Sequence, residues 1–328
     1  MSKPKSLTGI IINLTMNEQV LKTPKARASS EYRTDAYRQK LFSRLFAAVK
    51  EAIFFIYLYC GYVQLRDFLL ACCGRSRAVV LYYHRVGGRD VWTKPNEEFR
   101  NELAYLKSKY ECVSFRELCD RLAADIPLRQ RYVAITFDDG YRDNFTEAVP
   151  ALKDAGLSAT FFVATGFIET EREFPHDLRA LERGDIEALN FPKLTWDDLR
   201  SMEADGFEIG SHTINHTNMG SADEATIERE VKDSLAALNR ELSEKPRAFS
   251  FPWGKPQDMS EQAIKIAKRA NYYSAVSAYG GANTRKAKLF NIRRVDVGNG
   301  ELSRLAVRAR VAGFDPDFYR LKLKKWDV

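Results

Sequence analysis

Residue types that usually mark metal and redox proteins are scarce in this sequence, which has only five cysteines and four histidines in 328 residues. The cysteines form no Cys-x-x-Cys pair, which argues against a zinc knuckle and a disulfide framework. We therefore expect idle thiols in a reducing compartment, and a cytoplasmic location. The apolar fraction of 45% and the charged fraction of 29% exclude a wholly disordered chain and a multi-span membrane protein.

A long hydrophobic run is also missing. The apolar stretch Leu41 to Cys73 contains an uncharged part, Ala52 to Leu65, that falls short of the roughly 20 residues a membrane-spanning helix needs. Three interpretations stay open for residues 41–74: a helix packed on the catalytic domain, a helix lying in a membrane interface, and a short true span. Ile10 to Ile12 is too short for a secretory signal and no cleavage site follows it, so we expect no cleavable signal peptide.

Excess charge is absent from most of the chain. The formal net charge is +7, but residues 1–50 hold ten basic and three acidic residues, which leaves 41 of each sign in the remainder. A neutral body without a recognition motif argues against nucleic-acid binding. We expect residues 1–40 to be a disordered basic tail. Together with the apolar segment, it predicts peripheral contact of residues 1–74 with anionic lipid.

From residue 75 to 328, short apolar segments alternate with helical ones. This alternation is typical of a parallel α/β sheet with crossover helices, and seven strands suit a barrel at least as well as an open sheet. The expected strands are Ala78–His84, Val133–Asp138, Thr160–Val163, Phe207–His212, Phe249–Pro252, Ala275–Ala278 and Arg293–Val297. The expected helices are Glu98–Lys109, Phe115–Ala123, Phe145–Ala155, Trp196–Asp205, Glu224–Leu242 and Ser260–Asn271. The only connection of unusual length is Gly166–Leu194.

Two adjacent carboxylates stand where one of these strands ends. Asp138 and Asp139 follow the apolar run Tyr132 to Ile135, and Gly140 allows a tight turn directly after them. Catalytic groups of β/α folds lie at this end of the strands, and two acids held together share a proton or bind a cation. The alternative is an ordinary turn in which Asp accepts local hydrogen bonds.

Two of the four histidines stand at the end of the expected strand Phe207–His212 and just after it. His212 and His216 are four residues apart, and they share one face if the segment turns as a helix does. One carboxylate and two imidazoles would make three ligands and leave positions open for water and substrate. The spacing therefore predicts a catalytic metal site.

These motifs resemble those of the NodB-homology polysaccharide deacetylases, carbohydrate esterase family 4. Its TFDDG motif stands at Thr136–Gly140, its H-S/T-x-x-H motif at His212–His216, and the resemblance covers roughly residues 78–298. It implies a distorted (β/α)7 barrel that removes N- or O-acetyl groups from sugars. It also implies Asp138 as general base, and Asp139, His212 and His216 as ligands of one divalent ion. Zinc is the expected ion, with cobalt, nickel or manganese as substitutes.

A third family motif, R-x-P-F/Y, is altered here. Ser250 stands where an arginine would orient the base, and Arg293 or Arg294 is the expected replacement. The expected substrate-groove residues are Phe251, Pro252, Trp253, Gly254 and Trp196.

The late histidine that supplies the family's general acid is missing, because no histidine follows His216. His84 ends the first strand, and some family members resemble a circular permutation in which that strand comes first. The first and last strands of a closed barrel are neighbours, so His84 is the predicted general acid, with a structural histidine as the alternative. His176 is expected to face solvent in the long connection.

The predicted function is metal-dependent removal of acetyl groups, most of all N-acetyl groups, from a polysaccharide or oligosaccharide. Two alternatives stay open. One is a deformylase or deacetylase of a lipid-linked sugar at the membrane. The other is a catalytically inactive carbohydrate-binding barrel, suggested by the missing arginine and late histidine.

Overall fold

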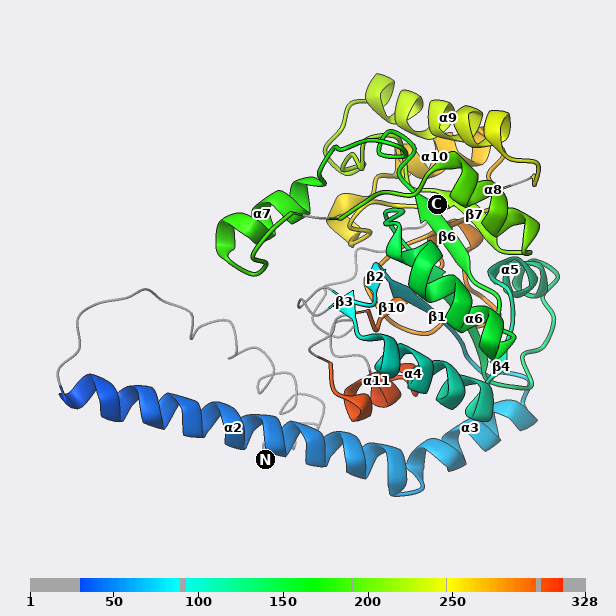
Figure 1. Ribbon diagram of the computed structural model, residues 1–328. Helices are drawn as coiled ribbons and strands as arrows, with labels where there is room; N and C mark the ends of the chain where they lie inside the picture. The colour runs from blue at the N-terminus through cyan, green and yellow to red at the C-terminus, as the bar shows by residue number, and fades with distance from the viewer. Residues whose placement is uncertain (1–29, 89–92, 190, 246, 299–301, 315–328) are drawn as a thin grey trace, which may run out of the picture.

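The computed structural model describes residues 30–88, 93–189, 191–245, 247–298 and 302–314 (Figure 1), with side chains from residue 40 onward. Residues 1–29 of the predicted tail lie outside the described residues. The chain runs from two N-terminal helices into a barrel of alternating strands and helices.

A path of parallel strands forms the barrel, in the order β10-β1-β5-β6-β7-β8-β9. Their bounds are β1 Ala78–Tyr83, β5 Tyr132–Phe137, β6 Thr160–Val163, β7 Glu208–Ser211, β8 Ala248–Ser250, β9 Ser274–Val276 and β10 Arg294–Asp296. Short β4 (Glu111–Cys112) pairs with β5 beside this path, and β2 (Arg85–Val86) pairs with β3 (Thr93–Lys94) apart from it.

The two ends of the path meet. Val276 of β9 forms a parallel bridge with Ile292, just before β10, and the Ser277 N–H donates to the Ile292 carbonyl at 2.9 Å. At the other end β1 pairs with both β10 and β5, so the first strand of the barrel does lie beside the last. The predicted distorted (β/α)7 barrel is therefore confirmed.

Helices surround the barrel, and most of them fall where the sequence pattern places them. They are α4 Asn96–Lys109, α5 Phe115–Ala123, α6 Val149–Ala155 after the short π-helix Asn144–Ala148, α8 Trp196–Ala204, α9 Glu224–Glu241 and α10 Glu261–Arg269. Helices α7 (Pro175–Arg183) and α11 (Arg304–Val311) were not predicted. Helix α7 lies within the long connection and projects to the left of the barrel in Figure 1.

Alternate residues of each strand face two different environments. On β1, Val80 packs with Ala134 of β5 and Phe162 of β6, whereas Val79 and Leu81 pack toward the helices. Every second side chain from Val80 on β1 and from Ala134 on β5 therefore points into the barrel. Asp138 stands four residues after Ala134, so it lies on the same side, at the carboxyl end of β5.

The N-terminal apolar segment forms two helices instead of one. Helix α2 spans Ser30–Tyr59, so it begins well before the expected Leu41, and α3 spans Tyr62–Cys72. The break lies at Gly61, whose φ of 87° is left-handed. The inner side of the pair packs on α11, where Phe54 and Leu58 lie among its alanines. Within the described ranges, no helix combines the length and the apolar character that crossing a bilayer requires.

Candidate active site

The acid pair lies at the carboxyl end of β5, in a turn of unusual backbone geometry. Asp139 and Gly140 both have left-handed φ values, 75° and 90°. Both aspartates are buried, and neither oxygen of the Asp139 carboxylate accepts a well-formed hydrogen bond from the described residues. A buried carboxylate without donors is costly unless a cation neutralises it.

The histidine pair lies in a loop after β7 rather than on a helical turn. Thr213 and His216 have left-handed φ values of 69° and 54°, and this bend brings the two imidazole centroids within 4.9 Å. Glu230 of α9 holds the loop in place, because its carboxylate accepts hydrogen bonds from the backbone N–H groups of Ile214 and Asn215 at 2.8 and 2.9 Å. The two imidazoles come together as expected, although by a different backbone route.

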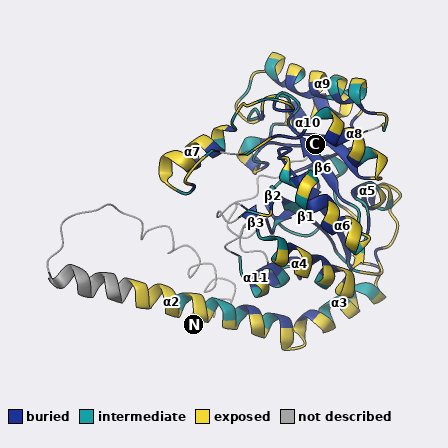
Figure 2. Ribbon diagram, viewed as in Figure 1, coloured by how far each residue is buried: buried dark blue, intermediate teal, exposed yellow. Residues whose placement is uncertain are grey.

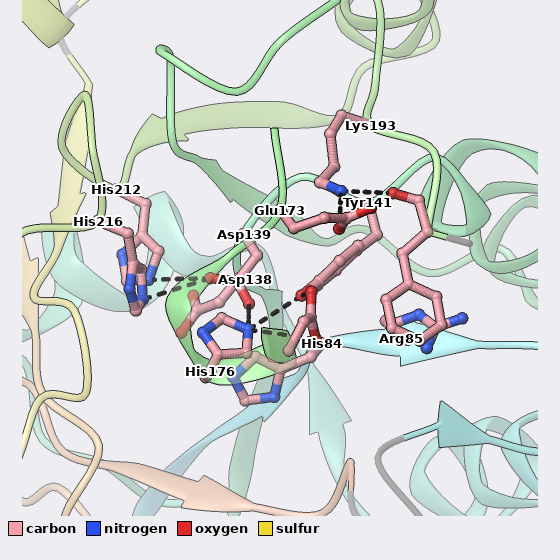
Figure 3. A network of polar contacts seen from close by, with 12 residues as sticks. His84, Arg85, Asp138, Asp139, Tyr141, Glu173, His176, Lys193, His212 and His216 are labelled. Atoms are coloured by element: carbon pink, nitrogen blue, oxygen red, sulfur yellow. Dashed lines mark hydrogen bonds and ion pairs between the residues drawn. The ribbon is translucent and has the colours of Figure 1, made fainter. Parts of the chain in front are cut away.

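Asp139, His212 and His216 converge on one point (Figure 3). The Asp139 Oδ1 atom lies 3.5 Å from the Nε2 atom of each histidine, and the three donor atoms all lie within 4.8 Å of one another. His212 donates through Nδ1 to the Ser250 carbonyl at 2.9 Å, which leaves its Nε2 lone pair facing the cluster.

Electrostatics also suit this cluster to a cation. Burial lowers the pKa of both His212 and His216, so both are neutral near pH 7, as metal ligands must be. Burial alone would raise the pKa of Asp139, but the neighbouring His176 outweighs it, and the net pKa is lowered. One carboxylate and two neutral imidazoles form a donor set that fits a divalent metal ion.

Arg294 holds the second carboxylate of the pair. Its guanidinium reaches across the barrel from β10 and donates two hydrogen bonds to Asp138, at 2.7 Å to Oδ1 and 2.6 Å to Oδ2. It also donates to the Ser250 hydroxyl at 2.9 Å, so the small serine leaves room for the arginine. Burial acts to raise the pKa of Asp138, yet Arg294 prevails and the net pKa is lowered. Arg293 faces elsewhere, toward the Tyr279 ring at 5.8 Å.

His84 follows β1 at the same mouth of the barrel (Figure 3). The carbonyl of His84 is fixed by a hydrogen bond of 2.8 Å from the Asn144 side chain. The imidazole is partly exposed, so it can meet both substrate and solvent.

The predicted groove residues divide into two groups. Trp253 lies against His216, with ring centroids 4.4 Å apart, and Gly254 after it leaves no room for a side chain, since a Cβ would lie 2.6 Å from the Ala278 nitrogen. Pro252 is buried beside them. Phe251, however, lies in the apolar core with no exposed surface, and Trp196 begins α8 and packs against the main core cluster.

The expectation that His176 faces solvent is wrong. It lies in the first turn of α7 with its Nε2 atom 3.4 Å from the Asp139 Oδ2 atom and 2.9 Å from the Tyr141 hydroxyl. Its ring stacks on Phe174 at a centroid distance of 5.1 Å. No sequence pattern predicts this contact, because it depends on how a long connection folds back over the barrel.

Comparisons with known proteins agree with this geometry. Residues 125–275 match the model of the polysaccharide deacetylase family. A putative polysaccharide deacetylase of Bacillus subtilis is 26% identical over 69% of this chain and 73% of its own. A poly-beta-1,6-N-acetyl-D-glucosamine N-deacetylase of Staphylococcus epidermidis is 23% identical over 77% of this chain and 84% of its own. The solved Streptococcus pyogenes deacetylase PplD superposes with a TM-score of 0.58 at 22% identity, covering 72% of this chain and 99% of its own.

Proposed function

We propose that the chain, whose residues 125–275 match the polysaccharide deacetylase family, hydrolyses the N-acetyl groups of a polysaccharide or oligosaccharide, as a NodB-homology enzyme of carbohydrate esterase family 4 would. The observation that carries the proposal is the buried Asp139 carboxylate, which accepts no well-formed hydrogen bond from the described residues and faces His212 and His216, with Asp138 beside it on Arg294. Relatives that act on poly-N-acetylglucosamine and on peptidoglycan N-acetylglucosamine support this substrate class.

We assign the divalent ion to Asp139, His212 and His216, and zinc is the ion we expect. When bound, such an ion polarises an acetyl carbonyl and lowers the pKa of a water. Asp138 takes the proton from the attacking water, and Arg294 keeps that carboxylate ionised and fixed in orientation. As the oxygen–carbon bond forms and the carbon–nitrogen bond breaks, His84 donates a proton to the leaving amine.

Incubation of the full chain, loaded with zinc, with N-acetylglucosamine oligomers tests this function. We expect acetate and a free amine in equal amounts, measured by mass spectrometry of both products. Binding of the oligomer without acetate release, with metal present, would favour the inactive carbohydrate-binding barrel instead.

His84→Ala should keep the metal and lower kcat on the amide substrate by roughly 10²–10⁴, the range for losing a general acid. The loss should be much smaller on an activated acetate ester, whose leaving group needs no proton. Measuring kcat on both substrates, with metal content as the control, separates the roles. An equal proportional loss on both would show that His84 only supports the fold.

We further propose that the protein binds a membrane surface through the apolar face of α2 and α3, and that this places it near a lipid-linked sugar. Exposed large apolar side chains concentrate on this face: Leu41, Phe42, Leu45, Val49, Phe55, Ile56, Tyr59, Tyr62, Leu65, Phe68 and Leu69. Figure 2 shows exposed residues along the outer side of both helices, opposite the side that packs on α11. Apolar side chains beside basic residues such as Lys40 and Arg44 suit an anionic bilayer interface.

The double variant Phe55→Ser/Phe68→Ser should lower binding to vesicles of phosphatidylglycerol and phosphatidylcholine by about tenfold or more. Each substitution removes exposed apolar area that would otherwise be buried against the lipid. Cosedimentation measures the binding. Leu178→Ser, which replaces an exposed apolar residue on α7, apart from α2 and α3 in Figure 1, is the matched control and should bind as the wild type does. Equal binding by all three proteins at low and moderate salt would contradict the membrane proposal and leave the deacetylase proposal intact.

A further inference from the structure

Helix α7 brings side chains to the metal cluster that the family motifs do not include. Its first turn carries His176 and Asp177, and Phe174 precedes it in the apolar cluster over the mouth of the barrel. The inner side of α7 is buried at Asp177 and Ala180, whereas Leu178 on the outer side is 43% exposed. The helix is therefore docked by one side only, and that side faces Asp139.

Hydrogen bonding fixes which nitrogen of His176 carries a proton. The Tyr141 hydroxyl donates its single proton to the Asp177 Oδ2 atom at 2.7 Å. The Tyr141 oxygen can then only accept from His176 Nε2, 2.9 Å away, so this nitrogen is protonated. A protonated Nε2 has no lone pair to offer a metal ion. His176 is therefore a hydrogen-bond donor at this position and not a fourth ligand.

The same N–H group also lies beside the metal-ligand carboxylate. The distance from His176 Nε2 to Asp139 Oδ2 is 3.4 Å, while Asp139 Oδ1 lies 3.5 Å from both ligand imidazoles. The two oxygens of Asp139 thus face different partners (Figure 3). The His176 ring cannot swing away easily, because it continues the stack of Phe174 on Phe167, whose centroids are 4.0 Å apart.

We infer that His176 is a positioning residue for the metal ligand Asp139, held in place by Tyr141 and the α7 stack. By drawing Oδ2 toward itself it turns Oδ1 to the two ligand imidazoles and so sets the affinity of the site for its ion. This inference rests on the proposed metal site. Partners of ligating carboxylates and imidazoles typically change metal affinity by about 10–100-fold when removed.

Metal affinity, measured by competition with a chelating dye, tests the inference without using activity. His176→Met fills the space of the ring but cannot donate, and it should weaken Co²⁺ affinity by about 10–100-fold. His176→Gln keeps an N–H donor near the position of Nε2 and should restore part of that loss. The Co²⁺ absorption band should keep its position in both variants, because the three ligands stay the same. Leu178→Ser, on the exposed side of the same helix, should match the wild type.

Unchanged Co²⁺ affinity in His176→Met would overturn the inference while leaving the metal site and the deacetylase proposal in place. A shifted absorption band with no rescue by glutamine would also overturn it, by showing that His176 is itself a ligand. A wild-type chain that binds no Co²⁺ would instead contradict the metal site on which the proposed function depends.

Discussion

His216→Ala is expected to abolish stoichiometric metal binding and deacetylase activity together. The substitution leaves Asp139 and His212, and two ligands rarely hold zinc against a chelator. Metal content should fall from one ion per chain to a small fraction of that, and kcat to the level of the uncatalysed reaction. Elemental analysis after passage through a chelator-treated column gives the metal content.

His84→Ala is the matched control for that experiment, because it also replaces a histidine at the mouth of the barrel but spares the donor cluster. It should retain one ion per chain. If His216→Ala also retained one ion per chain, His216 would not be a ligand, and another donor near Asp139 would have to take its place.

The second large effect is expected at Asp138. Asp138→Asn should keep the metal and lower kcat by roughly 10²–10⁴, because an amide cannot take the proton from water. The lowered pKa of Asp138 keeps this carboxylate ionised, so we expect the acid limb that it contributes to the kcat/KM profile to lie below the usual carboxyl range. Arg294→Met removes the cation that lowers this pKa, and the acid limb of the kcat/KM profile should move to higher pH.

Asp139→Asn is the comparison, because it replaces the neighbouring carboxylate by an amide in the same way. It should lose the metal that Asp138→Asn retains. The reverse pattern, with metal lost from Asp138→Asn and kept by Asp139→Asn, would show that the roles of the two carboxylates are exchanged.

The elements that the sequence predicts well are those set by local pattern. The β strands carry short apolar runs, and their order along the chain gives the barrel. The acid pair and the histidine pair were expected at strand ends because each follows such a run directly. Their convergence follows from parallel strands, whose carboxyl ends lie on one side of the sheet.

Contacts between distant parts of the chain were harder to predict. Arg294 and Asp138 are 156 residues apart, and the sequence alone could not choose between Arg293 and Arg294. Closure of the barrel decides, because side chains alternate along β10 and only one of two neighbours points inward. The position of His176 depends on how the connection after β6 folds over the mouth, which no periodic pattern encodes. Helix α2 begins at Ser30, in a stretch without an apolar period, and was expected to be tail.

The pairing of β1 with β10 has a consequence for how the centre is completed during synthesis. The segment matched by the family model, residues 125–275, contains Asp138, Asp139, His212 and His216 but neither His84 nor Arg294. His84 directly follows the first strand of the barrel and Arg294 lies in the last one, so the two strands can pair only after β10 has been made. A nascent chain therefore carries Asp139, His212 and His216 before it carries Arg294, the ion-pair partner of Asp138. We therefore expect the carboxylate of Asp138 to reach its final orientation only after β10 has joined the barrel.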